Sequence, residues 1–206
     1  MNNQRKATLF LCLFGLLFLT NSCVLDFFLE KESPPLPGKY ISLPKDNIKL
    51  FVPETFEKVS IANYRKQIEA VEDSVKKKNL LKRLNQNRIS KGNLYYVADD
   101  AIEMTVKMRP YFAFSKKESS YISGLFLKSC YEFSEMYNSN CERLRSGYSG
   151  NKKTQVFKGV YKVETNDETY FNTNYIISSN KKTFSILLIS SFDLDFDAYI
   201  EKIIVE

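Results

Sequence analysis

Three consecutive segments in the C-terminal half, residues 154–164, 170–178 and 183–190, alternate between apolar and polar side chains. A period of two places every second side chain on one face of an extended strand. The last two segments are joined by Ser179-Asn180-Lys181, whose length and composition are typical of a tight hairpin turn. A large part of the fold must therefore be antiparallel sheet.

Three more strands are predicted upstream, at 47–53, 93–98 and 101–108. In the last of these, apolar residues alternate with Glu103, Thr105 and Lys107, which predicts a polar face open to water.

Apolar residues at spacings of three and four predict helices from about residue 61 to 84, from about 120 to 137 and from about 196 to 204. In the first helix the pattern slips at residues 76–78, so the helix either bends there or gives way to a second short one. Ser119 or Ser120 can cap the second helix, and Asp193 or Asp195 the third.

This order of elements predicts an α+β fold, a mainly antiparallel sheet with helices packed on it, in one domain over residues 40–206. It resembles the PsbP-like lipoprotein domains of bacteria at residues 48–53 followed by Phe56, at 175–189 and at 196–200. The resemblance implies an α/β/α sandwich, and adaptor or assembly roles beside membrane complexes more often than catalysis. No functional residue of that family can be matched here position by position.

The first 22 residues resemble a bacterial lipoprotein signal peptide, with a short basic start, an apolar stretch at 7–19 and Ser22 before Cys23. The resemblance implies cleavage before Cys23, which would then carry a diacylglycerol thioether and an acyl chain such as palmitate. Thr20 departs from the leucine usual at its position. The alternative is an uncleaved anchor over residues 7–29, in which Asn21 and Asp26 would be costly.

Residues 23–39 are then a lipidated, proline-rich tether that holds the domain near a membrane of the cell envelope, facing the periplasm or the cell exterior. Removal of the leader would lower the formal net charge from +6 to +4. So mild a charge, without a recognisable nucleic-acid-binding fold, gives no case for a nucleic-acid partner.

Two cysteines stand in the body of the chain, Cys130 and Cys141. In an oxidising compartment they can form a disulfide that closes a loop of about a dozen residues. Because Cys130 falls inside a predicted helix, a bridge needs the chain to turn back soon after residue 137. A bridge and two buried free thiols are both open on the sequence.

The sequence contains no histidine, which excludes His-dependent triads and His-ligated zinc. Asp193, Asp195 and Asp197 mimic the start of a calcium loop, but an acidic helix N-terminus explains the triplet better. We therefore predict neither a metal nor a cofactor. Asp99, Asp100 and Glu103 are the carboxylates that a catalytic cleft would use.

A basic cluster at the end of the first helix is the remaining charged feature. Its core is Lys76, Lys77, Lys78, Lys82 and Arg83. Such a run is either a solvated helix face or a contact face for anionic headgroups or an acidic partner.

These features favour a non-catalytic binding or assembly module, held at the membrane by its lipid and paired with an envelope protein. The alternative is a small extracytoplasmic enzyme or a small-ligand carrier that uses carboxylates and tyrosines in a cleft. A deep pocket that gathers Asp99, Asp100 or Glu103 beside a tyrosine would favour the alternative.

Overall fold

The structure, a computed structural model, describes residues 35–165 and 168–206, and Pro37–Glu206 form one compact unit. A seven-stranded sheet forms its centre, and each pair of neighbouring strands in it is antiparallel. In spatial order its strands are β3 (Glu57–Val59), β4 (Leu94–Ala98), β5 (Ile102–Arg109), β9 (Lys182–Ser190), β8 (Thr169–Ser179), β7 (Thr154–Glu164) and β6 (Asn140–Gly150).

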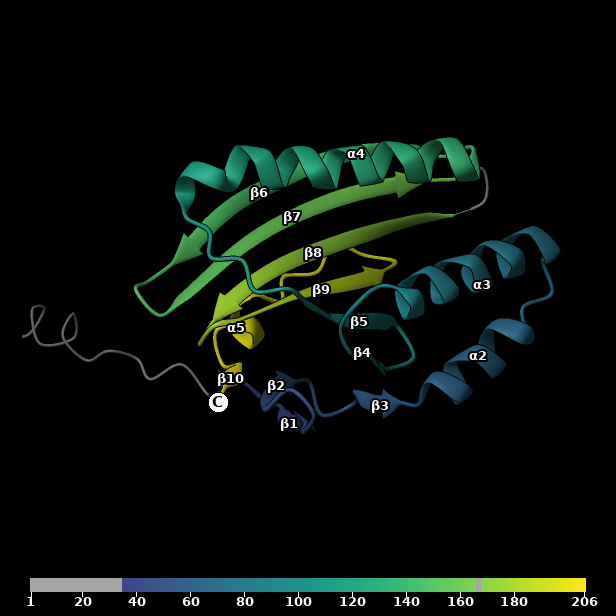
Figure 1. Ribbon diagram of the computed structural model, residues 1–206. Helices are drawn as coiled ribbons and strands as arrows, with labels where there is room; N and C mark the ends of the chain where they lie inside the picture. Colours follow the sequence, from purple (N-terminus) through teal and green to yellow (C-terminus); the bar gives the residue numbers. More distant parts are fainter. Residues whose placement is uncertain (1–34, 166–167) are drawn as a thin grey trace, which may run out of the picture. The chain divides into compact units, whose positions relative to one another are not determined.

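One side of this sheet, the helix face, is covered by α2 (Ile61–Glu69) and α3 (Ser74–Ile89) near β4 and β5, and by α4 (Ser119–Tyr137) along β6 and β7 (Figure 1). Tyr96 of β4 packs with Tyr64, Ile68 and Leu84 beneath α2 and α3. Phe126 of α4 packs between Phe157 and Tyr161 of β7. Because paired residues of adjacent strands lie on the same face, the register places both helical layers on one side of the sheet.

The opposite side, the groove face, carries a small sheet of β1 (Lys39–Leu43), β2 (Ile48–Val52) and β10 (Ile204–Val205), together with α5 (Asp197–Ile200). The largest core cluster lies here, between β2 and α5 on one side and β4, β5, β9 and β8 on the other. Leu50, Val52 and Phe196 are buried against Val106 and Leu188. The predicted fold class, α+β with a mainly antiparallel sheet and helices packed on it, is confirmed.

The predicted strands match the observed ones closely. β2, β4, β5, β7, β8 and β9 all lie within one or two residues of their predicted bounds. The β8–β9 hairpin turns through Asn180 (φ 46°) and Lys181 (φ 58°), so a two-residue turn with two left-handed residues joins them.

The prediction that one face of β5 is open to water was wrong. Thr105 and Lys107 are only 6% and 3% exposed. The α2–α3 pair covers this face, and the Lys107 ammonium donates to the carbonyl oxygens of Asn87, Ser90 and Gly92 at 2.7, 2.9 and 2.8 Å. The alternation of a strand does not reveal that one of its polar side chains will bind the carbonyl oxygens at the end of a helix.

The first predicted helix is two helices, but their boundary precedes the lysines. α2 ends at Glu69, and Asp73 caps α3 by accepting from the backbone N–H groups of Val75 and Lys76. The cap of α4 also differs from the prediction. Ser115 and Glu118 form a capping box on a 3₁₀ turn, Lys116–Glu118, that leads into α4 without a side-chain cap from Ser119 or Ser120.

Two other differences concern the ends of the large and small sheets. β6, an eleven-residue edge strand, was not predicted because its sequence shows no apolar alternation. The predicted C-terminal helix stops at Ile200, since Ile204 and Val205 pair with Lys49 and Ile48 of β2. Pairing with another strand here overrides a helical pattern.

The structure joins Cys130 of α4 to Cys141 of β6 in a disulfide, with their Cα atoms 6.0 Å apart. Asn138, in the left-handed region at φ 48°, ends α4 and turns the chain back toward β6. Among the residues described, none of the helices combines the length and apolar character needed to cross a bilayer.

Candidate ligand-binding groove

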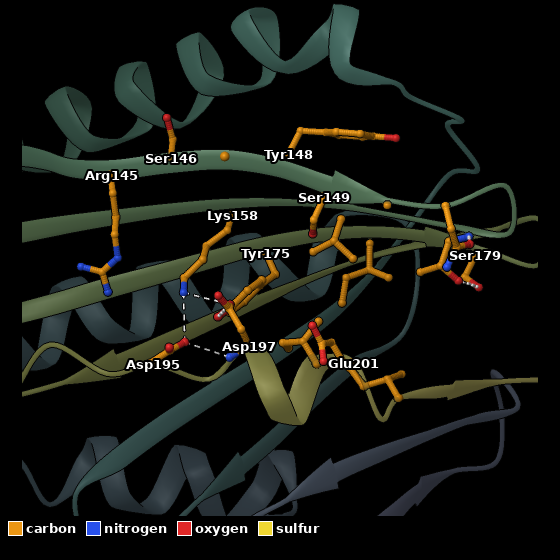
Figure 2. Close-up of a pocket in the computed structure, with 18 of the residues that line it drawn as sticks. Arg145, Ser146, Tyr148, Ser149, Lys158, Tyr175, Ser179, Asp195, Asp197 and Glu201 are labelled. Carbon is orange, nitrogen blue, oxygen red and sulfur yellow. Dashed lines mark hydrogen bonds and ion pairs between the residues drawn. The ribbon is translucent and has the colours of Figure 1, made fainter. Parts of the chain in front are cut away.

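A groove of about 1010 Å³ opens on the groove face of β6, β7 and β8. It exists because the small sheet and α5 cover the other strands of that face but stop short of β6 and β7. One wall is the large sheet, and the other is α5 with the segment that leads into β10 (Figure 2).

The register of the large sheet determines the sheet wall of the groove. Gly147 of β6 pairs with Lys158 of β7, which pairs with Tyr175 of β8. One step along, Ser149 pairs with Val156, which pairs with Ile177. Because β6 contributes a glycine and a serine at these positions, no bulky side chain of the edge strand fills the space.

A β-bulge in β6 decides which arginine enters the groove. Arg143 pairs with Tyr161 and Arg145 with Val160, so the register shifts by one residue between them. In a regular strand these two side chains would lie on the same face. With the bulge, Arg143 donates to the Ser123 hydroxyl of α4 at 2.9 Å, whereas Arg145 lies on the groove face.

Oppositely charged groups at the groove mouth are paired with one another. Arg145 donates two hydrogen bonds to Asp193, at 2.5 and 2.6 Å. Lys158 contacts Asp197 at 2.8 Å and Asp195 at 3.3 Å, and the Tyr175 hydroxyl donates to Asp197 at 2.7 Å. Figure 2 shows Lys158 and Tyr175 converging on the acidic segment at the start of α5.

These contacts fix the protonation states of the groove. Burial, reinforced by the hydrogen bond to Asp197, raises the pKa of Tyr175 well above its usual value. The hydrogen bonds from Arg145 lower the pKa of Asp193, and the backbone N–H of Asp197 lowers that of Asp195. The phenol is therefore protonated and both carboxylates are ionised near neutral pH, so none of these three groups is poised for proton transfer there.

The rest of the lining is mixed. The floor and far wall have an apolar part formed by Val156, Ile177, Ile200, Ile203 and Val205, and Ser149, Asn151, Thr154, Ser179 and Glu201 also line the groove. A partly apolar floor under a rim of paired charges suits the binding of an apolar or amphipathic group, with the rim available for orientation.

Asp193, Asp195 and Asp197, which we interpreted as an acidic helix N-terminus in preference to a calcium loop, all belong to this rim. Instead of converging on one point, they bind the side chains of Arg145 and Lys158. Among the described residues there is no cluster of three or more acidic or cysteine side chains suited to a metal ion.

The carboxylates considered for a catalytic cleft do not line this groove. Glu103 lies on the helix face, where it accepts from Tyr64 at 2.7 Å and from Arg83 at 2.9 Å. Burial raises the pKa of Tyr64, and that of neighbouring Tyr96 to about 12. Asp99 accepts from the backbone N–H groups of Ala101 and Ile102 in the β4–β5 turn. Glu103 and Asp99 therefore support the packing of elements.

The structure divides the predicted basic cluster. Arg83 points inward to Glu103, and Lys76 pairs with Glu168 at 3.2 Å. Lys78 and Lys82 are exposed on the outer side of α3, and Lys77 is half-buried. Cys23 and residues 1–22 of the leader lie outside the described residues, as does the tether before residue 35.

Sequence reasoning missed Arg145, Lys158 and Tyr175 as groove residues. One signal was available, because the alternation of β7 places Lys158 directly between two apolar residues of the same face, Val156 and Val160. A lysine at such a position needs a carboxylate partner, and the triplet at 193–197 supplies it.

Comparison with known proteins identifies the fold. No protein-family model matches the sequence, and no curated protein matches it. The solution structure of the cyanobacterial PsbP protein CyanoP from Synechocystis sp. PCC 6803 is similar, with a TM-score of 0.54 and 11% identity over 87% of this chain and 99% of that one. The Ran-binding protein Mog1p of Saccharomyces cerevisiae has a TM-score of 0.50 and 10% identity over 82% and 96%. The chain therefore has a PsbP-like fold.

Proposed function

We propose that this protein is a lipid-anchored, non-catalytic binding module of the bacterial cell envelope, and that the groove on β6–β8 receives a segment of an envelope protein. The observation that carries the proposal is the internal pairing of the rim charges above a floor that is partly apolar. A partner that covers the floor removes apolar surface from water. It need not supply a counter-charge to any of the paired groups.

The same pairing argues against catalysis in the groove. A nucleophile or general base needs a pKa close to the working pH, or a neighbouring base that activates it. Here Tyr175 is held protonated by burial and by Asp197, and Lys158 is engaged with two carboxylates. These residues are suited to hold the strand wall and α5 together.

A photo-crosslinking amino acid in the groove tests the partner. Ser149 on β6 and Glu201 after α5 are exposed and lie on opposite walls, and Lys128 on α4 is an exposed control on the helix face. In intact cells, positions 149 and 201 should capture the same envelope protein, and position 128 should not. Equal capture from all three positions, or none from the groove, would contradict the proposal.

The membrane part of the proposal is supported by the leader and by Cys23. We expect the mature protein to begin at Cys23 and to carry fatty acid in intact-mass measurement. A Cys23→Ala variant should lose both processing and the acyl mass. If that variant matures normally and stays with the membrane fraction, the protein is attached in another way.

A small-ligand carrier is the second candidate, favoured by the size of the groove. Its volume of about 1010 Å³ is at the upper end of the range for small-molecule sites, which is roughly 300–1,000 Å³. Native mass spectrometry of protein purified from its own cells distinguishes the two functions. A stoichiometric apolar adduct would favour the carrier if it is lost in the Ile203→Ala variant, which removes apolar lining from the groove. Ligand-free protein would favour the binding module.

A further inference from the structure

The outer side of α3 combines positive charge with exposed aliphatic side chains. Over its sixteen residues the helix contains no acidic residue. Its basic residues are Lys76, Lys77, Lys78, Lys82, Arg83 and Arg88. Lys76 and Arg83 are engaged with Glu168 and Glu103. Within the described residues no carboxylate lies at ion-pair distance from Lys78 or Lys82.

Two large apolar residues share the outer surface with these lysines. Val75 is 66% exposed and Ile89 is 84% exposed. Together with Lys78 and Lys82 they form what we call the α3 stripe, with successive spacings of three, four and seven residues. Those spacings keep the four residues on one side of a helix. Leu84, only 1% exposed, marks the opposite side, where α3 packs on Ile68 and Tyr96.

The stripe places exposed aliphatic side chains and lysines on the same side of α3. An exposed isoleucine at one end and an exposed valine at the other enclose two free ammonium groups. Between the lysines the surface is hollowed, and Leu81 and Ile89 contribute to the hollow. Lysines that reach anionic headgroups while aliphatic side chains enter the interface are characteristic of helices that lie on membranes.

We propose that the α3 stripe docks on the surface of a bilayer that contains anionic lipids. All the charges of α3 are positive, which favours a lipid surface over a protein partner. A protein that binds an amphipathic helix would ordinarily place charged groups opposite particular side chains, whereas a lipid surface needs only to be negative. The inference does not depend on the acylation of Cys23, because it concerns the folded unit alone.

Docking through α3 leaves the groove accessible. α3 lies on the helix face near β4 and β5, whereas the groove is on the opposite face near β6 and β7 (Figure 1). A domain held by the stripe would therefore present the groove away from the lipid, where a partner can approach it.

Charge reversal in the full-length chain tests the stripe. Lys78→Glu with Lys82→Glu should lower partition onto phosphatidylglycerol-containing vesicles by at least about tenfold in a sedimentation assay at low salt. Binding of the unchanged chain to the same vesicles should fall at high salt, since exposed charges are screened. Ile89→Ser should weaken binding severalfold without a change in net charge.

The matched control is Lys152→Glu with Lys153→Glu, two exposed lysines in the turn between β6 and β7, which changes net charge by the same amount. It should bind vesicles nearly as well as the unchanged chain. Circular dichroism should show that all variants keep the fold. Equal losses in both double variants would mean that net charge alone drives binding and would overturn the proposal, as would unchanged binding of the Lys78/Lys82 variant.

The outcome is independent of the proposed groove function. Cross-linking from positions 149 and 201 reports on the groove, and the vesicle assay reports on α3. A retained cross-link with no vesicle binding would reject the stripe alone. Vesicle binding with no cross-link would reject the groove partner alone.

Discussion

Lys107 is a residue of strand β5, but its side chain caps the C-terminal end of helix α3. Its side chain is buried, and the ammonium binds three carbonyl oxygens in and just after the last turn of α3. The last carbonyl groups of a helix have no partner within the helix and carry its negative dipole end. Burial, with Arg109 nearby, lowers the pKa of Lys107 from its usual value.

We expect Lys107→Met to destabilise the protein by about 2–3 kcal/mol, because buried carbonyl groups lose a charged donor while the aliphatic packing is kept. Urea unfolding followed by circular dichroism measures the change. Lys152→Met, at an exposed turn position, is the matched control and should change stability by less than about 0.5 kcal/mol. A similar small effect at both positions would show that water replaces the ammonium of Lys107.

At the level of elements, local sequence and long-range pairing contribute differently. The β8–β9 hairpin is specified locally, since alternation and a two-residue turn fix its register. α3 also begins at a local signal, the Asp73 cap. β6 depends instead on long-range pairing. Its own sequence pattern does not predict a strand, and both its extended conformation and its bulge are seen only in its pairing with β7.

The turn of that hairpin offers a stability test. Lys181 adopts φ 58°, a conformation unfavourable for a residue with a Cβ atom and natural for glycine. Lys181→Gly should therefore raise the free energy of unfolding by about 0.5–1 kcal/mol, seen as a higher urea midpoint. Lys152→Gly, in the β6–β7 turn and without a positive φ, should lower it. A loss of stability in both variants would argue against strain at Lys181.

At the level of the whole molecule, unequal coverage of the large sheet creates the groove. On the helix face α4 reaches β6 and β7, but on the groove face the small sheet and α5 end over β8. The Cys130–Cys141 disulfide ties α4 to β6, the edge strand that forms one wall. The covalent link thus supports a strand that has a sheet partner on only one side.

We expect Cys130→Ala with Cys141→Ala to lower stability by about 3 kcal/mol, from the loop-closure entropy restored to the unfolded chain. Thermal unfolding measures the loss, and dithiothreitol should lower the midpoint of the unchanged protein but not of the variant. Non-reducing mass spectrometry should find neither cysteine alkylated. Alkylation of both would show that the thiols are free and would leave the entropy argument without basis.

The sequence by itself determined the fold class and most of the large sheet, because a period of two and hairpin turns are local signals. It did not determine the groove on β6–β8. Arg145, Lys158 and Asp197 come from an edge strand, a neighbouring strand and a short helix, and they meet only because of the β6 bulge and the position of α5. The same holds for the face of β5 assigned to water and for the division of the basic cluster into inward and outward residues. Tertiary structure decided these features because each depends on which element covers a face, and coverage is a relation between segments distant in the chain.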